Sequence, residues 1–86
     1  MKALPEDLAL LRRCGVALWG LDWRPQLRRE FGINPHTVRR WMSGEAIVPR
    51  TLWVALAQLM HERAAAIEGL AGEIDASLAG EPAERV

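Results

Sequence analysis

Six polar or basic side chains fall between positions 34 and 43 of this 86-residue chain: Asn34, His36, Thr37, Arg39, Arg40 and Ser43. Arginine carries a planar fork of donors that can pair with guanine O6 and N7 or hold a phosphate. The amide, imidazole and hydroxyl groups can hydrogen-bond to base edges or to phosphate oxygens. The composition of this stretch therefore predicts side chains that read base pairs in double-stranded DNA.

A second group of residues surrounds that stretch and is suited to hold the sugar–phosphate backbone rather than to read bases. Its members are Trp23, Arg24, Gln26, Arg28, Arg29 and Arg50. Trp23 has two possible roles, because a tryptophan beside a basic face can contact a phosphate or close the edge of the core.

The charges of the chain are segregated, although their sum is zero. Residues 12–50 carry eight arginines against three acids, a net charge of +5, whereas residues 51–86 carry two arginines against six acids, a net charge of −4. A basic middle followed by an acidic end favours a positive face turned toward phosphates. The alternative is that the arginines are merely solvated on helix surfaces.

Capping residues predict a short helix over residues 23–31. Asp22 is suited to be its N-cap, Pro25 is tolerated in its first turn, and Gly32 is suited to end it in a left-handed conformation. Leu27 and Phe31, four residues apart, would share its buried face.

A second short helix is predicted from Pro35 to about Ser43, after the three-residue turn Gly32-Ile33-Asn34. Asn34 is a strong N-cap, proline is favoured at the first helical position, and Gly44 would close the helix. Val38, Trp41 and Met42 would form its buried face. Two short helices joined by a tight turn that contains glycine define a helix-turn-helix.

The run from Trp23 to Gly44 resembles the helix-turn-helix of the Cro and lambda-repressor-like regulators. Phe-Gly-Ile-Asn at positions 31–34 and Thr-Val-Arg-Arg-Trp-x-x-Gly at positions 37–44 are similar to the turn and recognition helix of that family. The likeness covers residues 17–60 and includes Val48-Pro49, where such proteins begin their next helix. It implies a lambda-repressor-like fold whose recognition helix enters the major groove.

This chain departs from the family pattern at one position, and two of its features resemble a narrower group of regulators. Arg28 stands where the family has a small residue, so its side chain either runs outward or changes the angle between the two helices. The tryptophan before the first motif helix and the Ala-Leu-rich tail are similar to short phage-encoded regulators, including anti-CRISPR-associated repressors.

An N-terminal helix is predicted from the start Leu4-Pro5-Glu6-Asp7. Its inner face would contain Leu8, Leu11, Val16, Leu18 and Trp19. Gly15 would weaken or bend this helix, and Gly20 would end it. In the loop before Pro49, Ile47 is expected to be buried beneath the core.

A long last helix is predicted from Arg50 to about Leu78, with one apolar stripe along it. The expected dimer interface is the distal part of that stripe: Ile67, Leu70, Ala71, Ile74 and Leu78. The two copies could pair in parallel or antiparallel, and the alternative is that this part folds back onto its own domain. Gly69 and Gly72 indicate either a close helix contact or a break near residue 69.

The fold class predicted is all-α, with four to five helices. The expected organisation is a DNA-binding domain over residues 1–63, a dimerisation extension over residues 64–79 and a disordered tail over residues 80–86.

A single cysteine, Cys14, excludes an internal disulfide, and with His36 and His61 it gives no zinc-ligand spacing. We expect no cofactor, no small-molecule ligand, no catalytic residues, no membrane span and no signal peptide, and hence a cytoplasmic protein.

These features predict a homodimeric repressor that occludes a promoter by binding an inverted-repeat operator. The alternative is a protein-interaction module, resembling an antitoxin or adaptor, that acts through its long C-terminal helix.

Overall fold

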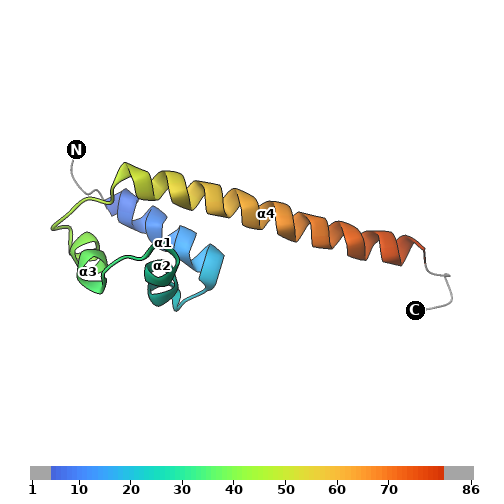
Figure 1. Cartoon of the computed structure of the whole chain (residues 1–86), viewed down its shortest axis with the longest axis horizontal. Helices are drawn as coiled ribbons and strands as arrows, with labels where there is room; N and C mark the ends of the chain where they lie inside the picture. The colour runs from blue at the N-terminus through green and yellow to red at the C-terminus, as the bar shows by residue number, and fades with distance from the viewer. Residues whose placement is uncertain (1–4, 81–86) are drawn as a thin grey trace. The chain divides into compact units, whose positions relative to one another are not determined.

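The computed structural model describes residues 5–80, which form four α-helices and no strand. The helices are α1 (Pro5–Trp19), α2 (Trp23–Phe31), α3 (Pro35–Ser43) and α4 (Arg50–Ala79) (Figure 1). This confirms the predicted all-α class and the predicted helix bounds.

The chain divides into an N-terminal unit, residues 5–56, and a C-terminal unit, residues 57–80. Residues 81–86 of the predicted disordered tail lie outside the described part.

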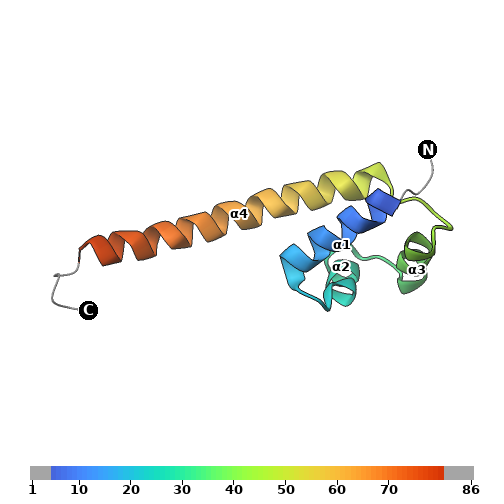
Figure 2. The same cartoon turned by 180° about the vertical axis from the view of Figure 1, so that it is seen from behind.

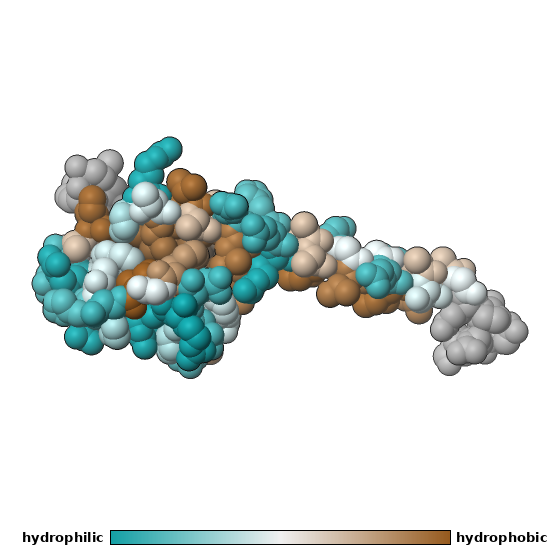
Figure 3. Space-filling view, viewed as in Figure 1, coloured by the Kyte–Doolittle hydropathy of each residue, from teal (hydrophilic) through white to brown (hydrophobic). Residues whose placement is uncertain are grey.

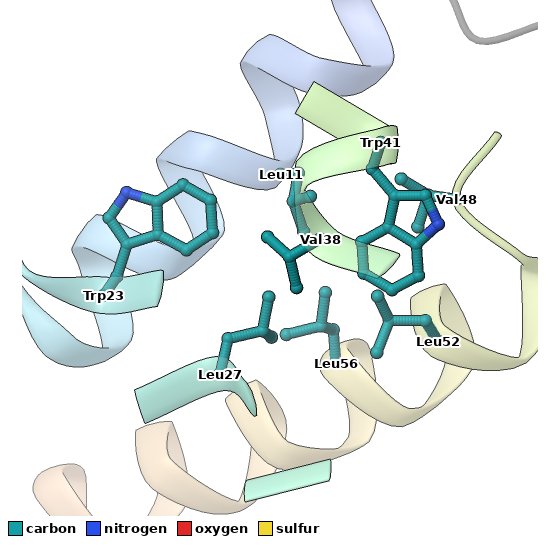
Figure 4. Close-up of a cluster of buried hydrophobic side chains, with 8 residues drawn as sticks. All are labelled: Leu11, Trp23, Leu27, Val38, Trp41, Val48, Leu52 and Leu56. Carbon is teal, nitrogen blue, oxygen red and sulfur yellow. The ribbon is translucent and has the colours of Figure 1, made fainter. Parts of the chain in front are cut away.

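One hydrophobic core joins the helices of the N-terminal unit. Its buried members are Leu11 of α1, Trp23 and Leu27 of α2, Val38 and Trp41 of α3, Val48 of the loop, and Leu52 and Leu56 of α4 (Figure 4). Every element of the unit contributes to this cluster, so the two short helices are held by tertiary packing rather than by helix propensity. Seen from behind, α2 and α3 are again consecutive helices joined by a short connection (Figure 2).

The turn between α2 and α3 forms as its residue types predict. Gly32 has a φ of 63°, a left-handed conformation, and its N–H donates to the carbonyl of Arg28. The side-chain oxygen of Asn34 accepts a hydrogen bond of 2.7 Å from the N–H of His36, and Pro35 occupies the first turn of α3. Asp22 differs from expectation, because its side chain makes no capping hydrogen bond to α2.

Gly15 has a steric role that its sequence context did not reveal. Helix α1 continues through this residue to Trp19, and Gly20, with a φ of 87°, follows its end as predicted. A Cβ atom at position 15 would lie 2.7 Å from Cγ of Trp23 and closer still to two other ring carbons. The absence of a side chain therefore allows the indole of α2 to pack directly on the backbone of α1.

Two apolar residues lie differently from their predicted positions. Ile47 is 45% exposed, and Val48, its neighbour, is buried instead at 8%. Val16 of α1 is also exposed, whereas Leu11 on the same helix is completely buried. The prediction of a buried Ile47 was wrong because a loop has no fixed periodicity from which to infer the inward side chain.

The C-terminal unit consists of the remainder of α4. The helix is continuous through Gly69 and Gly72, so the predicted alternative of a break near residue 69 is wrong. All residues from 61 to 80 are exposed in the single chain. Figure 3 shows hydrophobic side chains gathered along one side of this part of α4.

Candidate nucleic-acid interface

A groove in the N-terminal unit brings α2 and α3 side chains to one surface. Its volume is about 590 Å³, and we call it the arginine groove. Helix α2 contributes Arg24 and Arg28, helix α3 contributes Pro35, His36, Val38, Arg39, Arg40, Met42 and Ser43, and Glu45 follows α3. The groove thus unites two of the predicted backbone-binding residues with four of the predicted base-reading residues.

The charge of the groove is strongly positive. Four arginines line it, against a single acid, Glu45. The guanidinium carbon of Arg24 lies 5.4 Å from the ring centroid of Trp23, which is a cation–π distance. In Figure 3 the surface over α2 and α3 is predominantly hydrophilic. This combination of positive charge and hydrogen-bond donors is suited to a phosphate-rich ligand.

Arg28 occupies an intermediate position between the core and solvent. It is half-buried and lines the groove, whereas its neighbour Leu27 is completely buried in the core. Its charged end is therefore available at the surface, which agrees with the outward-running alternative expected at this departure from the family pattern.

Residues of α3 divide between two sides of the helix. His36, Arg39 and Arg40 are exposed and line the groove. Thr37 is half-buried and lines a different, mainly apolar hollow together with Phe31, Ile33, Trp41 and the beginning of α4. Because successive helical residues are about 100° apart, Thr37 lies about 160° from Arg39 but only about 60° from Arg40 around α3. Of the six predicted base-reading residues, Asn34 and Thr37 are therefore the two that do not line the arginine groove.

Asn34 and Ser43 are both engaged in local hydrogen bonds at the two ends of α3. Asn34 caps the N-terminus through the N–H of His36. The hydroxyl of Ser43 lies within donor distance of the carbonyl of Arg40, at 3.1 Å, and of Oε2 of Glu45, at 3.2 Å. A hydroxyl has one proton, so it donates to one of these acceptors at a time.

Several predicted backbone-binding residues lie outside the groove lining. Arg29 donates to Gln26 over 3.2 Å on the exposed surface of α2, and Arg50 is exposed at the start of α4. Trp23 is only 3% exposed and belongs to the core. Of the two predicted roles of Trp23, the structure favours packing in the core. The cation–π contact with Arg24 connects its ring to the basic surface.

Arg12 and Arg13 of α1 were not singled out as site residues, yet they adjoin this surface. Arg12 shares one hollow with Trp23 and Arg24, and Arg12 and Arg13 share another with Met42, which also lines the arginine groove. Their inclusion in the basic segment 12–50 was the only sequence signal, since no helix-turn-helix pattern extends to α1.

The potential metal ligands of the described residues are dispersed. No three His, Cys, Asp or Glu side chains within the described residues gather to hold a metal ion. Burial raises the pKa of the partly buried Cys14 thiol, although the charge of Arg13 opposes this. None of the described helices is both long enough and apolar enough to cross a membrane.

The predicted dimer interface forms an exposed apolar face in the single chain. Ile67, Leu70, Ile74 and Leu78 are between 59% and 65% exposed, and Ala71 is also exposed. These positions differ by three, four and four residues, so the continuous helix places them on one side.

No known protein family, curated protein or solved structure matches this chain. Its function is therefore inferred from the geometry and chemistry of the chain itself.

Proposed function

We propose that the protein is a sequence-specific, double-stranded-DNA-binding transcriptional regulator that acts in the cytoplasm. The observation that carries this proposal is the arginine groove, in which Arg24 and Arg28 of α2 meet Arg39 and Arg40 of α3. In this role α3 is the recognition helix, whose exposed side lies in the major groove, and α2 crosses the adjacent backbone. This arrangement supports kinship with the Cro and lambda-repressor-like regulators.

The roles of individual residues are assigned from their positions. His36, Arg39 and Arg40 are the proposed base-reading residues because they are exposed on α3 and line the groove. Arg24 and Arg28 are the proposed phosphate-binding residues of α2. Asn34 contributes by fixing the N-terminus of α3, since its side-chain oxygen accepts a hydrogen bond from the N–H of His36.

The protein is further proposed to act as a homodimer on an inverted repeat. One recognition helix reads too few base pairs for selectivity in a genome, so a second copy is needed. The exposed apolar face of α4, from Ile67 to Leu78, is the surface proposed to bind that copy. Occupation of a promoter by such a dimer would repress transcription by excluding the polymerase.

Selection of bound duplexes from a random pool tests this function. The full chain is expected to enrich a palindromic sequence with half-sites centred about 10 base pairs, or a multiple of that distance, apart. Enrichment of a single, non-repeated half-site would contradict the dimer, and failure to enrich any sequence would contradict specific DNA binding.

A protein-interaction module is the second candidate function. It is favoured by the same exposed face of α4, since contiguous apolar surface on a helix is typical of a protein-binding site. Under this alternative, capture of a partner protein would be insensitive to moderate salt, and duplex DNA would not compete for it.

A further inference from the structure

The only acid in the arginine groove is attached to one of its arginines. Oε1 of Glu45 lies 3.8 Å from Nε of Arg40, and Oε2 of Glu45 lies 3.2 Å from the hydroxyl of Ser43. One carboxylate oxygen thus faces the arginine, and the other is one of two alternative acceptors for the serine hydroxyl. The Arg40 and Glu45 side chains remain 49% and 68% exposed, so the pair is at the surface.

The backbone conformation after α3 explains how Glu45, five residues after Arg40 in the sequence, lies beside it. Gly44 adopts a φ of 84°, which reverses the chain at the end of α3. The N–H of Glu45 then donates to the carbonyl of Arg40 over 2.9 Å. The same N–H lies 3.4 Å from the Ser43 hydroxyl oxygen. Glu45 is therefore fixed beside Arg40 by its backbone as well as by its side chain.

Stability alone does not account for a glutamate at this place. The C-terminal end of a helix carries partial negative charge, so a carboxylate there is electrostatically unfavourable. An ion pair this exposed contributes little to folding. In a groove for DNA, a carboxylate also repels the phosphates.

The atom that Glu45 faces indicates what it does. The carboxylate faces Nε of Arg40, which leaves the two terminal nitrogens of the guanidinium free. Those two nitrogens form the end-on fork that matches O6 and N7 of guanine. At 3.8 Å the contact is an ion pair rather than a hydrogen bond, so it biases the guanidinium toward this orientation, and a biased side chain loses fewer conformations on binding than a free one.

We propose that Glu45 is a specificity-determining positioning residue, which holds Arg40 so that its terminal nitrogens read a guanine. The inference rests on the proposed function, because it requires α3 to lie in the major groove. Ser43 has the supporting role of anchoring the carboxylate rather than reading a base. The operator is accordingly inferred to contain, in each half-site, one guanine that depends on both Arg40 and Glu45.

The test compares specific and non-specific DNA binding by the full chain and by Glu45→Gln. Duplexes are selected from a random pool with each protein, and affinities are then measured for the wild-type site and for a scrambled duplex. Glu45→Gln is expected to bind the scrambled duplex at least as tightly as the wild type, since it has lost a repelling charge. Its preference for the selected site is expected to fall about fivefold or more, and one guanine per half-site should lose its enrichment.

Two further variants separate positioning from other roles. Ser43→Ala removes the anchor and should reduce the preference for the same guanine, by less than Glu45→Gln does. Glu30→Gln removes an equal charge from an exposed residue of α2 outside the groove lining, and it should leave the selected sequence unchanged.

The outcomes distinguish the inference from the function on which it rests. If Glu45→Gln binds both duplexes more tightly by the same factor, the carboxylate only repels phosphates. If it binds both more weakly by the same factor, Glu45 serves the fold. Either result overturns the proposal. A wild-type protein that selects no sequence would overturn both the inference and the proposed function. A wild-type protein that selects a site which Glu45→Gln selects equally well would overturn only the inference.

Discussion

Arg39 and Arg40 are neighbours in the chain but have different surroundings. Arg40 is paired with Glu45 at 3.8 Å, whereas Arg39 lines the same groove and has no ion pair among the described residues. The two side chains leave α3 about 100° apart, so under the proposed function they would contact different parts of a duplex. The proposed base reading would therefore use one arginine with no ion pair among the described residues and one arginine beside a carboxylate.

Truncation of Arg39 should be costly for binding to a selected site. Arg39→Ala is expected to weaken specific binding by about 1–3 kcal/mol, the range for an arginine paired with a guanine. The matched control is Arg29→Ala, which removes an exposed arginine of α2 outside the groove lining. It should weaken binding to all sequences alike, and by less. In an electrophoretic shift assay, an equal loss by Arg39→Ala on the selected and a scrambled duplex would contradict base reading, and no loss would remove Arg39 from the interface.

At the scale of the elements, α2 and α3 are positioned by glycines and by indole packing. Gly32 and Gly44, both in the left-handed conformation, end the two helices, and Asn34 starts the second. Gly15 lets Trp23 pack against the backbone of α1, so the placement of α2 depends on a residue eight positions upstream.

A methyl group at position 15 should disturb this packing. Gly15→Ala is expected to destabilise the fold by about 1–3 kcal/mol, as overpacking does, despite the better helix propensity of alanine. Gly72→Ala is the control, because a Cβ there would meet no atom within 4 Å. That variant should gain up to about 1 kcal/mol. Urea unfolding followed by circular dichroism measures both, and a Gly15→Ala protein as stable as the wild type would contradict the steric role.

The helices and the turn could be predicted from the sequence because their signals are local. An N-cap, a first-turn proline and a glycine stop lie within a few residues of each boundary, as at Asn34, Pro35 and Gly44. The choice between Ile47 and Val48 could not be predicted, since it depends on how the loop approaches the core.

The site was predicted less completely than the fold. The basic and polar residues of this segment were evident, but which of them share a groove depends on the facing helix, and Asn34 and Thr37 do not line it. The pairing of Glu45 with Arg40 requires the chain reversal at Gly44, so helical spacing gave no indication of it. Arg12 and Arg13 adjoin the surface only through the packing of α1.

At the scale of the whole molecule, the chain combines a basic N-terminal unit with an acidic helical C-terminal unit. Residues 5–56 contain the core and the arginine groove, whereas residues 57–80 contain no buried side chain. A helix with a long exposed apolar face is unfavourable in water unless that face is covered. Pairing with a second copy would cover it and would double the DNA surface read.

A charge introduced into the proposed interface should separate the two copies. Ile74→Glu is expected to convert the dimer to a monomer, because the carboxylate would be desolvated in an apolar contact. Ala76→Glu adds the same charge about 160° around the helix and should leave the dimer intact. Size-exclusion chromatography with light scattering measures the mass of each. Dimers of equal strength in both variants would place the interface elsewhere.

The salt dependence of binding to the selected duplex tests the central claim, that the arginine groove binds DNA. Neutralised phosphates release counterions, so the logarithm of the association constant should fall linearly with the logarithm of the salt concentration. With Arg24 and Arg28 as the proposed phosphate-binding residues of the groove, the expected slope is about −2 per protomer or steeper. Arg39→Ala should weaken binding to this duplex throughout the salt range. Affinity that is unchanged between low and moderate salt, or no saturable binding at low salt, would contradict DNA binding by the groove.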